Sequence, residues 1–375
     1  MRFEPGLPIA AVALWLPPRR QTATEAVAAG LIDAQAVADN GYLAVTVSDE
    51  LAAPQMAVLA ASDALARAGW DPATVELGVH AWTYYQGHDF WSPAHFVAHG
   101  MGAHRAVPVG VQQMCNGGAA AVEIAAARLV ADPAVARAVV TTADRFAPPV
   151  FDRWSGDSGA VYGDGASALL LARPDDGPAA RQAPPVEQPP PAEQPPPAGR
   201  APLAGRAPLA GRAPLRLLAV TSVAASKLEA AHRGDDPFGP APRSVTDEVS
   251  SRRTMRQFFA GGGRPVLAGL AAGCLHAVLA AALTEAGLAG DDVRYVALPR
   301  LGRSVLDTGH QALIATHTTA EVLELGRDTG HLGAGDAAAN LAVLHAGGLL
   351  ASGECAILLS VGAGFTWSAI VVQAV

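Results

Sequence analysis

The sequence predicts an α/β fold built from two related halves, in which mixed β-sheets are covered by helices on both faces. Three observations lead to this prediction. A proline-rich segment divides the chain, a sequence repeat spans that segment, and helices alternate with buried strands on both sides of it. With 375 residues, 50% of them hydrophobic and 16% charged, the chain is long enough for one large or two ordinary domains. This composition excludes collagen, coiled coil and wholesale disorder.

The boundary between the halves lies in a segment of unusual composition. Residues 182–197 are rich in proline and glutamine, and three copies of Ala-Gly-Arg-Ala-Pro-Leu follow, starting at Ala198. Proline fixes φ and lacks a backbone donor, so we expect an extended, solvated linker. We therefore divide the chain into a first half (1–174), a linker or insertion (175–215) and a second half (216–375).

The two halves share a repeat. Ala-Leu-Ala-Arg-Ala-Gly begins at Ala64, Ala-Leu-Thr-Glu-Ala-Gly begins at Ala282, and an alternating strand follows each of them. The two copies start 218 residues apart, and so do the apolar strands that start at Arg137 and Cys355. Two matches at one offset indicate an internal duplication.

The first half contains a candidate nucleophile. An apolar run at 106–111 is followed by Cys115 and then by an alanine-rich stretch at 119–130, which predicts a buried strand, a tight turn and a buried helix. Cys115 would lie at a helix start, where free backbone N–H groups and the helix dipole stabilise a thiolate. Gly117 and Gly118 would let a substrate approach the backbone closely. An unreactive, buried cysteine is the alternative.

Several function classes are excluded or disfavoured. Cys115, Cys274 and Cys355 are too few for a disulfide framework and lack the spacing of a zinc site, so we predict no metal and a reducing, cytoplasmic setting. A net charge of −8 argues against a primary nucleic-acid binder. We also find no stretch that approaches the roughly 18–20 uncharged apolar residues of a membrane span, and we expect no membrane partner.

Four motifs occur in one order along the chain: 109–124 around the cysteine, Thr142-Ala-Asp-Arg145, Tyr162-Gly-Asp-Gly-Ala166 and Gly362-Ala-Gly-Phe-Thr-Trp367. In order and approximate spacing they resemble the β-ketoacyl-acyl-carrier-protein synthase III (KAS III) family of the thiolase superfamily. The resemblance covers roughly residues 45–174 and 215–375.

The resemblance implies a fold and a reaction. The fold would be the thiolase fold, with αβαβα layers and a five-stranded mixed sheet from each half, usually in a homodimer. Cys115 would take an acyl group from a thioester of coenzyme A or of an acyl carrier protein. The backbone amides of Ala363 and Cys115 would form the oxyanion hole.

The sequence departs from the family's catalytic pattern at two positions. A condensing KAS III has a Pro-His step where this chain has Pro299-Arg300, and a Gly-Asn step where this chain has Gly330-His331. Arginine is charged at any working pH and can hardly act as a general base, whereas histidine titrates in the useful range. We therefore predict His331 as the acid/base group, with Arg300 and Asp336 nearby, and His310 as the other histidine available.

The segment from Gly330 to Asp336 is similar to a natural-product branch of KAS III-like proteins. Some of its members transfer an acyl group to oxygen or nitrogen without forming a carbon–carbon bond, using cysteine, histidine and aspartate. Asp336 matches that aspartate, but the histidine would fall at or near Arg300. Our leading hypothesis is an acyltransferase of polyketide or related secondary metabolism. The alternatives are a decarboxylative synthase acting on malonyl carrier protein, as in fatty acid biosynthesis, and a catalytically silent partner subunit.

The remaining expectations concern substrates. The family's Trp-Ile…Arg-Thr-Gly-Ile segment, which grips coenzyme A, has no counterpart between Ala34 and Leu51, so a carrier-protein donor stands beside acyl-coenzyme A. We expect no cofactor apart from these thioester substrates, and a small-molecule acceptor. Tyr85 and His88 lie in an aromatic run, 81–95, that lines the acyl pocket or the dimer interface or serves packing alone. They are our weaker candidates for substrate binding.

Overall fold

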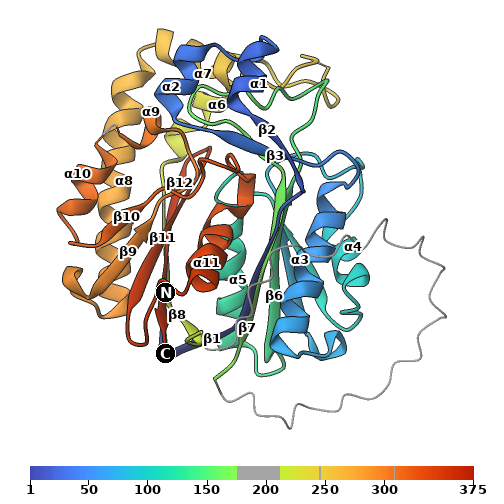
Figure 1. Cartoon of the computed structure of the whole chain (residues 1–375), viewed down its shortest axis with the longest axis vertical. Helices are drawn as coiled ribbons and strands as arrows, with labels where there is room; N and C mark the ends of the chain where they lie inside the picture. The colour runs from blue at the N-terminus through green and yellow to red at the C-terminus, as the bar shows by residue number, and fades with distance from the viewer. Residues whose placement is uncertain (175–211, 245, 308) are drawn as a thin grey trace.

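The computed structural model describes residues 1–174, 212–244, 246–307 and 309–375 (Figure 1). The predicted linker, 175–215, therefore lies outside the described residues except for its last four positions.

The described strands form a ten-stranded sheet in the order β10-β9-β11-β12-β8-β1-β7-β6-β4-β5, and β2 and β3 form a separate pair. The strands are β1 (Arg2–Trp15), β2 (Arg19–Thr22), β3 (Ala44–Val47), β4 (Leu77–Ala81), β5 (Val107–Val111), β6 (Arg137–Asp144), β7 (Gly165–Ala172), β8 (Leu215–Ala224), β9 (Val293–Ala297), β10 (Glu321–Leu323), β11 (Cys355–Gly362) and β12 (Thr366–Ala374).

The helices lie between and around these strands. The α-helices are α1 (Ala23–Ala28), α2 (Ala34–Asn40), α3 (Ala53–Ala68), α4 (Pro93–Gly100), α5 (Gly117–Ala131), α6 (Ala230–Arg233), α7 (Ser251–Ala260), α8 (Gly263–Ala286), α9 (Arg303–Leu306), α10 (His310–Ala315) and α11 (Asp336–Gly347). Short 3-10 turns are η1 (Pro72–Thr74), η2 (Ser226–Leu228), η3 (Gly290–Asp292) and η4 (Gly333–Gly335).

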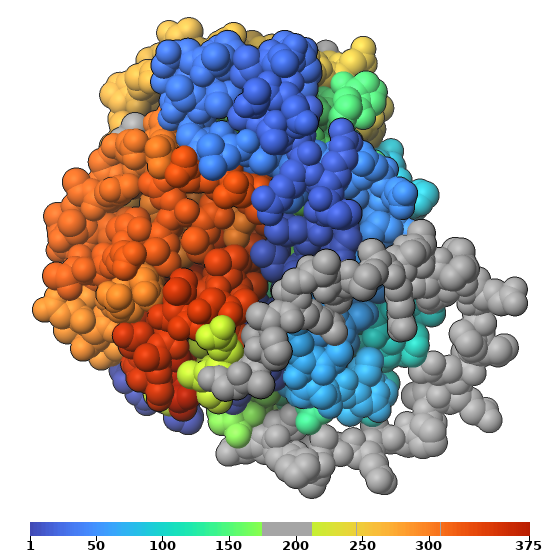
Figure 2. Space-filling view, in the orientation of Figure 1, coloured from blue at the N-terminus to red at the C-terminus, as the bar shows by residue number. Residues whose placement is uncertain are grey.

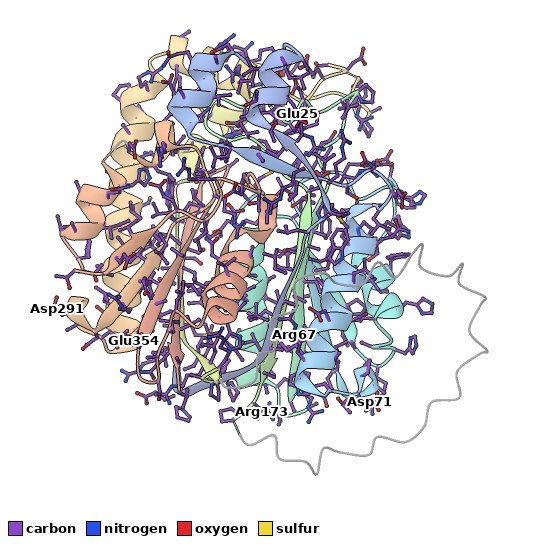
Figure 3. The ribbon with its side chains drawn as sticks, in the orientation of Figure 1. Glu25, Arg67, Asp71, Arg173, Asp291 and Glu354 are labelled. Atoms are coloured by element: carbon purple, nitrogen blue, oxygen red, sulfur yellow. The ribbon has the colours of Figure 1, made fainter. Side chains whose placement is uncertain are left out.

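The predicted duplication is visible in the sheet. In the first half β4 pairs in parallel with β5 and β6, and β6 pairs antiparallel with β7; in the second half β9 pairs in parallel with β10 and β11, and β11 pairs antiparallel with β12. Leu77 lies opposite Ala138, and Tyr295 lies opposite Ala356, which is the same pair 218 residues further on. Figure 3 labels Asp71 and Asp291 in the corresponding turns before β4 and β9. The fold class is confirmed, with five mixed strands from each half.

The layers follow from where the apolar side chains lie. Helices α5 and α11 pack between the strands of the two halves, where their buried alanines and leucines form one core with residues of both sheets (Figure 1). Helices α3 and α4 cover the outer face of the first half, and α8 covers the outer face of the second. Alanine dominates α5, which lets the helix lie close to strands on either side. The order of layers is αβαβα.

The expectation that no stretch of the chain approaches the length of a membrane span was wrong. Helix α8 is long and apolar enough to cross a membrane, and it holds 18 consecutive residues, 266–283, without Asp, Glu, Lys or Arg. The stretch was missed because most of its residues are small alanines and glycines, and the search looked for large apolar side chains. In the structure Leu275, Val278 and Leu279 of α8 are buried against the outer face of the second half, which is the packing of a covering helix.

Residues 19–47 form a cap over the upper end of both halves (blue in Figure 2). Thr22 and Glu25 form a reciprocal capping box that starts α1, and Gly41, with φ of 74°, ends α2. The chain then runs along the second half: the N–H of Leu43 bonds Arg327 O, and the N–H of Thr46 bonds Thr329 O. The cap therefore contacts the segment that leads into His331.

Gly163 lies tightly against the second half. A Cβ at this position would lie 1.8 Å from the carbonyl oxygen of Thr329, so no larger residue fits without moving the backbone. We expect Gly163→Ala to lower the free energy of unfolding by about 1–3 kcal/mol and to reduce activity, because the shifted segment leads into His331. Gly269→Ala is the control, since no atom of the described residues lies within 4 Å of a Cβ there and alanine favours the helix. Urea denaturation of both variants measures the difference, and equal midpoints would contradict the prediction.

Candidate active site

Cys115 lies in the turn between β5 and α5, as the sequence predicts, and is half-buried. The strained position of the turn is Met114, whose φ is 49°. The glycines that follow serve a different purpose from the one we expected. A Cβ on Gly118 would lie 2.2 Å from the carbonyl oxygen of Ala334, so the missing side chain admits the loop of the second half, rather than a substrate, against the start of α5.

His331 and Asp336 form a buried pair. His331 Nδ1 lies 2.6 Å from Asp336 Oδ2, and both side chains are almost fully buried, at 1% and 3% exposure. The other carboxylate oxygen, Oδ1, accepts the N–H of Leu332 at 2.9 Å. Asp336 is the first residue of α11, where the helix dipole favours a negative charge. The carboxylate therefore fixes the orientation of the imidazole.

The charges of this pair support each other. Burial alone would lower the pKa of His331, but Asp336 and the neighbouring Cys115 sulfur raise it well above its ordinary value. Burial would raise the pKa of Asp336, but His331 and Arg300 lower it. Nε2 of His331 is buried and has no hydrogen-bond partner among the described residues. The imidazole therefore offers its free nitrogen on the side of the cysteine, and it holds a proton at neutral pH.

Arg300 lies behind this pair. Its backbone N–H donates to Asp336 Oδ2 at 2.7 Å, and its side chain donates from Nε to Asn340 Oδ1 at 2.9 Å and from Nη1 to Thr329 Oγ1 at 2.6 Å. The guanidinium is thus occupied with α11 and with the loop before His331, and its charge acts on Asp336. Only Nη2 lacks a partner in the described part of the chain. His310, the other histidine considered, begins α10 and has no contact with Cys115 in the described structure.

The predicted oxyanion loop, 362–364, is the turn between β11 and β12. A Cβ on Gly362 would lie 2.5 Å from the backbone nitrogen of Asn116 and 2.8 Å from the carbonyl oxygen of Gln113, so the turn lies directly against the cysteine segment. The N–H groups of Cys115 and Ala363 have no hydrogen-bond partner among the described residues. Both are available as donors to a substrate oxygen.

Asp144 ties the site to the first half, a role that we did not predict. Its carboxylate accepts the N–H groups of Thr83 and Tyr84, at 2.9 and 2.7 Å, and that of Ala334 at 3.0 Å. Burial raises the pKa of Asp144 to about 7, although the backbone donors oppose the rise. The only sequence signal was its place in the motif Thr142-Ala-Asp-Arg145. Asp144 holds the loop that joins His331 to Asp336.

Aromatic side chains border the histidine. The aromatic cluster consists of Tyr84, Phe146, Phe151 and Tyr162, whose rings pack on one another. The rings of Tyr162 and His331 lie with their centroids 5.1 Å apart. Tyr85 and His88 are exposed on the loop after β4 and have no contact with Cys115 or His331 in the described residues. The preceding residue, Tyr84, is the tyrosine of this loop that belongs to the aromatic cluster.

Comparisons with known proteins concern the family and the fold. The family model of 3-oxoacyl-[acyl-carrier-protein (ACP)] synthase III matches residues 109–182, and the model of its C-terminal part matches residues 283–374. No curated protein matches the chain by sequence. Within the described residues, no group of three or more His, Cys, Asp or Glu side chains is arranged to hold a metal ion.

Solved structures share the fold over nearly the whole chain. ChlB3, an acyltransferase, is 28% identical, covers 99% of this chain and 98% of its own, and gives a TM-score of 0.79. The 3-oxoacyl-[acyl-carrier-protein] synthase III of Aquifex aeolicus VF5 is 18% identical, with coverages of 98% and 100% and a TM-score of 0.72. OleA of Xanthomonas campestris, with bound lauric acid and lauroyl-CoA, is 17% identical, with coverages of 98% and 99% and a TM-score of 0.68. Two parts of the chain therefore match family models of 3-oxoacyl-[acyl-carrier-protein] synthase III, and nearly the whole chain shares the fold of these solved structures.

Proposed function

We propose that this chain is a cytoplasmic acyltransferase of polyketide or related secondary metabolism. It takes an acyl group from a carrier-protein or coenzyme A thioester onto Cys115 and passes it to a small-molecule acceptor. One observation carries the proposal: His331 is held through Nδ1 by Asp336, while its Nε2 is free on the side of Cys115. The similarity to ChlB3, an acyltransferase at 28% identity, supports the same kind of reaction.

In the proposed acylation His331, whose pKa Asp336 raises, holds the proton taken from Cys115, and the sulfur reacts as a thiolate. The sulfur attacks the thioester carbonyl, and the N–H groups of Cys115 and Ala363 bind the oxyanion that forms. When the carbonyl is restored, the carbon–sulfur bond to the donor breaks. The pantetheine thiolate leaves with the proton from His331, so the imidazole becomes neutral and Cys115 carries the acyl group as a thioester.

Transfer uses the same histidine in the opposite direction. Neutral His331 accepts a proton from the acceptor's hydroxyl or amino group as that group attacks the acyl carbonyl. The same two N–H groups bind the second oxyanion. Collapse of this intermediate breaks the bond to Cys115, and the sulfur leaves as a thiolate beside the protonated imidazole. Each cycle therefore returns the starting charges.

The side chain of Arg300 argues against a condensing reaction. Decarboxylation of a malonyl thioester makes an enolate, whose oxygen needs two strong donors. In this site His331 offers one, but the guanidinium that replaces the family's second donor uses Nε and Nη1 for Asn340 and Thr329, and only its Nη2 lacks a partner among the described residues. We assign Arg300 to positioning Asp336.

The proposal is tested by intact-mass spectrometry of the purified protein with a panel of acyl-coenzyme A and acyl-carrier-protein thioesters. We expect a mass gain equal to one acyl group, mapped by peptide analysis to Cys115 and not to Cys274 or Cys355. The adduct should then be lost to an acceptor without release of carbon dioxide. Carbon dioxide release with malonyl carrier protein would favour the condensing alternative, and no adduct with any donor would favour the silent subunit.

The proposed enzyme is a homodimer that pairs through β5. This strand lies at the edge of the ten-stranded sheet and is partly exposed, and among the described strands it pairs only with β4. The strand at the opposite edge, β10, has three residues. In the loop between β4 and α4, Phe90 and Trp91 expose large apolar surfaces, Phe90 completely. A second copy would cover both the free strand and these side chains.

The double variant Phe90→Ser with Val107→Asp should therefore be monomeric. Light scattering should give a mass near 38.1 kDa for this variant and twice that value for the unaltered protein. Val266→Asp is the matched control, because Val266 is exposed to a similar degree, 50% against 59% for Val107, but lies on α8. A monomeric unaltered protein would refute the prediction.

A further inference from the structure

The aromatic cluster includes a buried hydroxyl, that of Tyr162, which the proposed mechanism does not use. Tyr162 places its ring against His331 and its hydroxyl 3.5 Å from Asp157 Oδ2, which also accepts the hydroxyl of Ser251. Burial and the charge of Asp157 hold the pKa of Tyr162 well above its ordinary value. The phenol therefore stays protonated, donates its hydrogen to Asp157, and keeps its oxygen as an acceptor.

His232 is the second unused group. It lies on α6, with its ring centroid 5.3 Å from that of Phe365, and Phe365 directly follows the oxyanion loop. His232 Nδ1 is buried and has no hydrogen-bond partner in the described part of the structure. Burial lowers the pKa of His232, although Asp157 acts in the other direction. The ring is therefore neutral at pH 7, and it offers one donor and one acceptor nitrogen.

The cluster lies on the interior side of the cysteine. Phe146, Phe151 and Tyr162 are exposed by only 0%, 7% and 8%. In an acyl-enzyme reaction the long pantetheine arm of the donor must extend to solvent, so the buried side receives the acyl group. An aliphatic lining would suffice for a plain hydrocarbon chain. Here the aromatic cluster carries the hydroxyl of Tyr162, and Phe365, which follows the oxyanion loop, packs on the imidazole of His232, whose Nδ1 lacks a partner among the described residues.

We propose that Tyr162 and His232 are specificity-determining residues that select an acyl group bearing a hydroxyl substituent. This inference rests on the proposed function and names the class of acyl group that Cys115 carries. A hydroxyl both donates and accepts, so it can satisfy the tyrosine and the neutral histidine together. A carboxylate substituent would face the charge of Asp157, and an unsubstituted chain would leave the buried Nδ1 of His232 without a partner among the described residues.

The test compares rates of Cys115 acylation by N-acetylcysteamine thioesters, followed by intact mass. Butyryl is compared with 3-hydroxybutyryl and 4-hydroxybutyryl, and hexanoyl with 6-hydroxyhexanoyl. We expect at least one hydroxylated ester to react about 10-fold or more faster than its parent. His232→Gln and Tyr162→Phe should each lose most of this preference while still forming the adduct with the parent ester. His317→Gln is the control, since His317 is hydrogen-bonded to His276 on the outer surface.

The outcomes separate the two proposals. Adducts that form at equal rates with hydroxylated and parent esters would overturn the specificity inference and leave the proposed function standing. An undiminished preference in both variants would also overturn it. So would a loss confined to the transfer step, which would place these residues on the acceptor side. No adduct with any ester overturns the proposed function and this inference with it. Two substitutions on different elements guard against one variant failing to fold.

Discussion

Replacing Cys115 by alanine is expected to abolish acyl-enzyme formation and to lower transfer by at least about 10³-fold. The sulfur is the only group in the proposed site that carries the acyl chain, and the residual rate would come from the oxyanion donors and from binding alone. Because Cys115 is half-buried and its side chain is small, the substitution should leave the fold unchanged. Intact mass and an acyl-transfer assay measure the two effects.

The controls for this variant are the other two cysteines. Cys274 lies in α8 and Cys355 opens β11; both are buried, and burial raises the pKa of both thiols. Cys274→Ala and Cys355→Ala should therefore still form the adduct. Transfer that survives in Cys115→Ala at the unaltered rate would mean that the acyl group passes directly from donor to acceptor, and the covalent mechanism would be wrong.

Asp336→Asn should change the pH dependence of acylation. In the unaltered protein Asp336 and Cys115 hold the pKa of His331 well above its ordinary value, so the imidazole stays protonated through neutral pH and can protonate the leaving thiol. The amide removes the charge, and burial then lowers the pKa of His331. The variant's imidazole should therefore lose its proton at a lower pH than that of the unaltered protein. Acylation should fall by about 10²-fold or more at pH 8 and by less at pH 6.

The measurement is the rate of adduct formation between pH 5.5 and 9 in both proteins. The descending limb of the profile, where His331 loses its proton, should move to lower pH in Asp336→Asn. Asn340→Ala is the matched comparison: it removes a partner of Arg300 on the same helix and leaves the carboxylate in place. A uniform loss at every pH, with no shift of the limb, would show that Asp336 only supports the structure.

Much of the fold could be predicted because duplication and hydrophobic periodicity are properties of short segments. The offset of 218 residues between Arg137 and Cys355 is found again in the strand pairing, and the strand, turn and helix around Cys115 lie where the pattern places them. The apolar helix α8 was missed for a physical reason: its alanines and glycines carry little side-chain hydrophobicity each, and only their number makes the stretch long enough.

The site was harder to predict because its contacts join residues far apart in the chain. His331 and Asp336 are five residues apart, so their partnership could be anticipated. The direction of the Arg300 side chain depends on Thr329 and Asn340, and the role of Asp144 depends on a loop of the other half. To decide which of Tyr84 and Tyr85 packs into the aromatic cluster, one must know the direction in which the chain leaves β4. Sequence patterns do not contain that information.

The position of β1 has a consequence for biosynthesis. This strand lies in the middle of the ten-stranded sheet, between β7 and β8, and the amino group of Met1 donates to Val220 O at 2.6 Å. A ribosome therefore releases an apolar strand long before either of its neighbours exists. The first half can pair β1 with β7 early, but the other edge stays open until 215–224 emerge. During that interval the nascent chain presents an unpaired strand edge to which chaperones, or another copy, can bind.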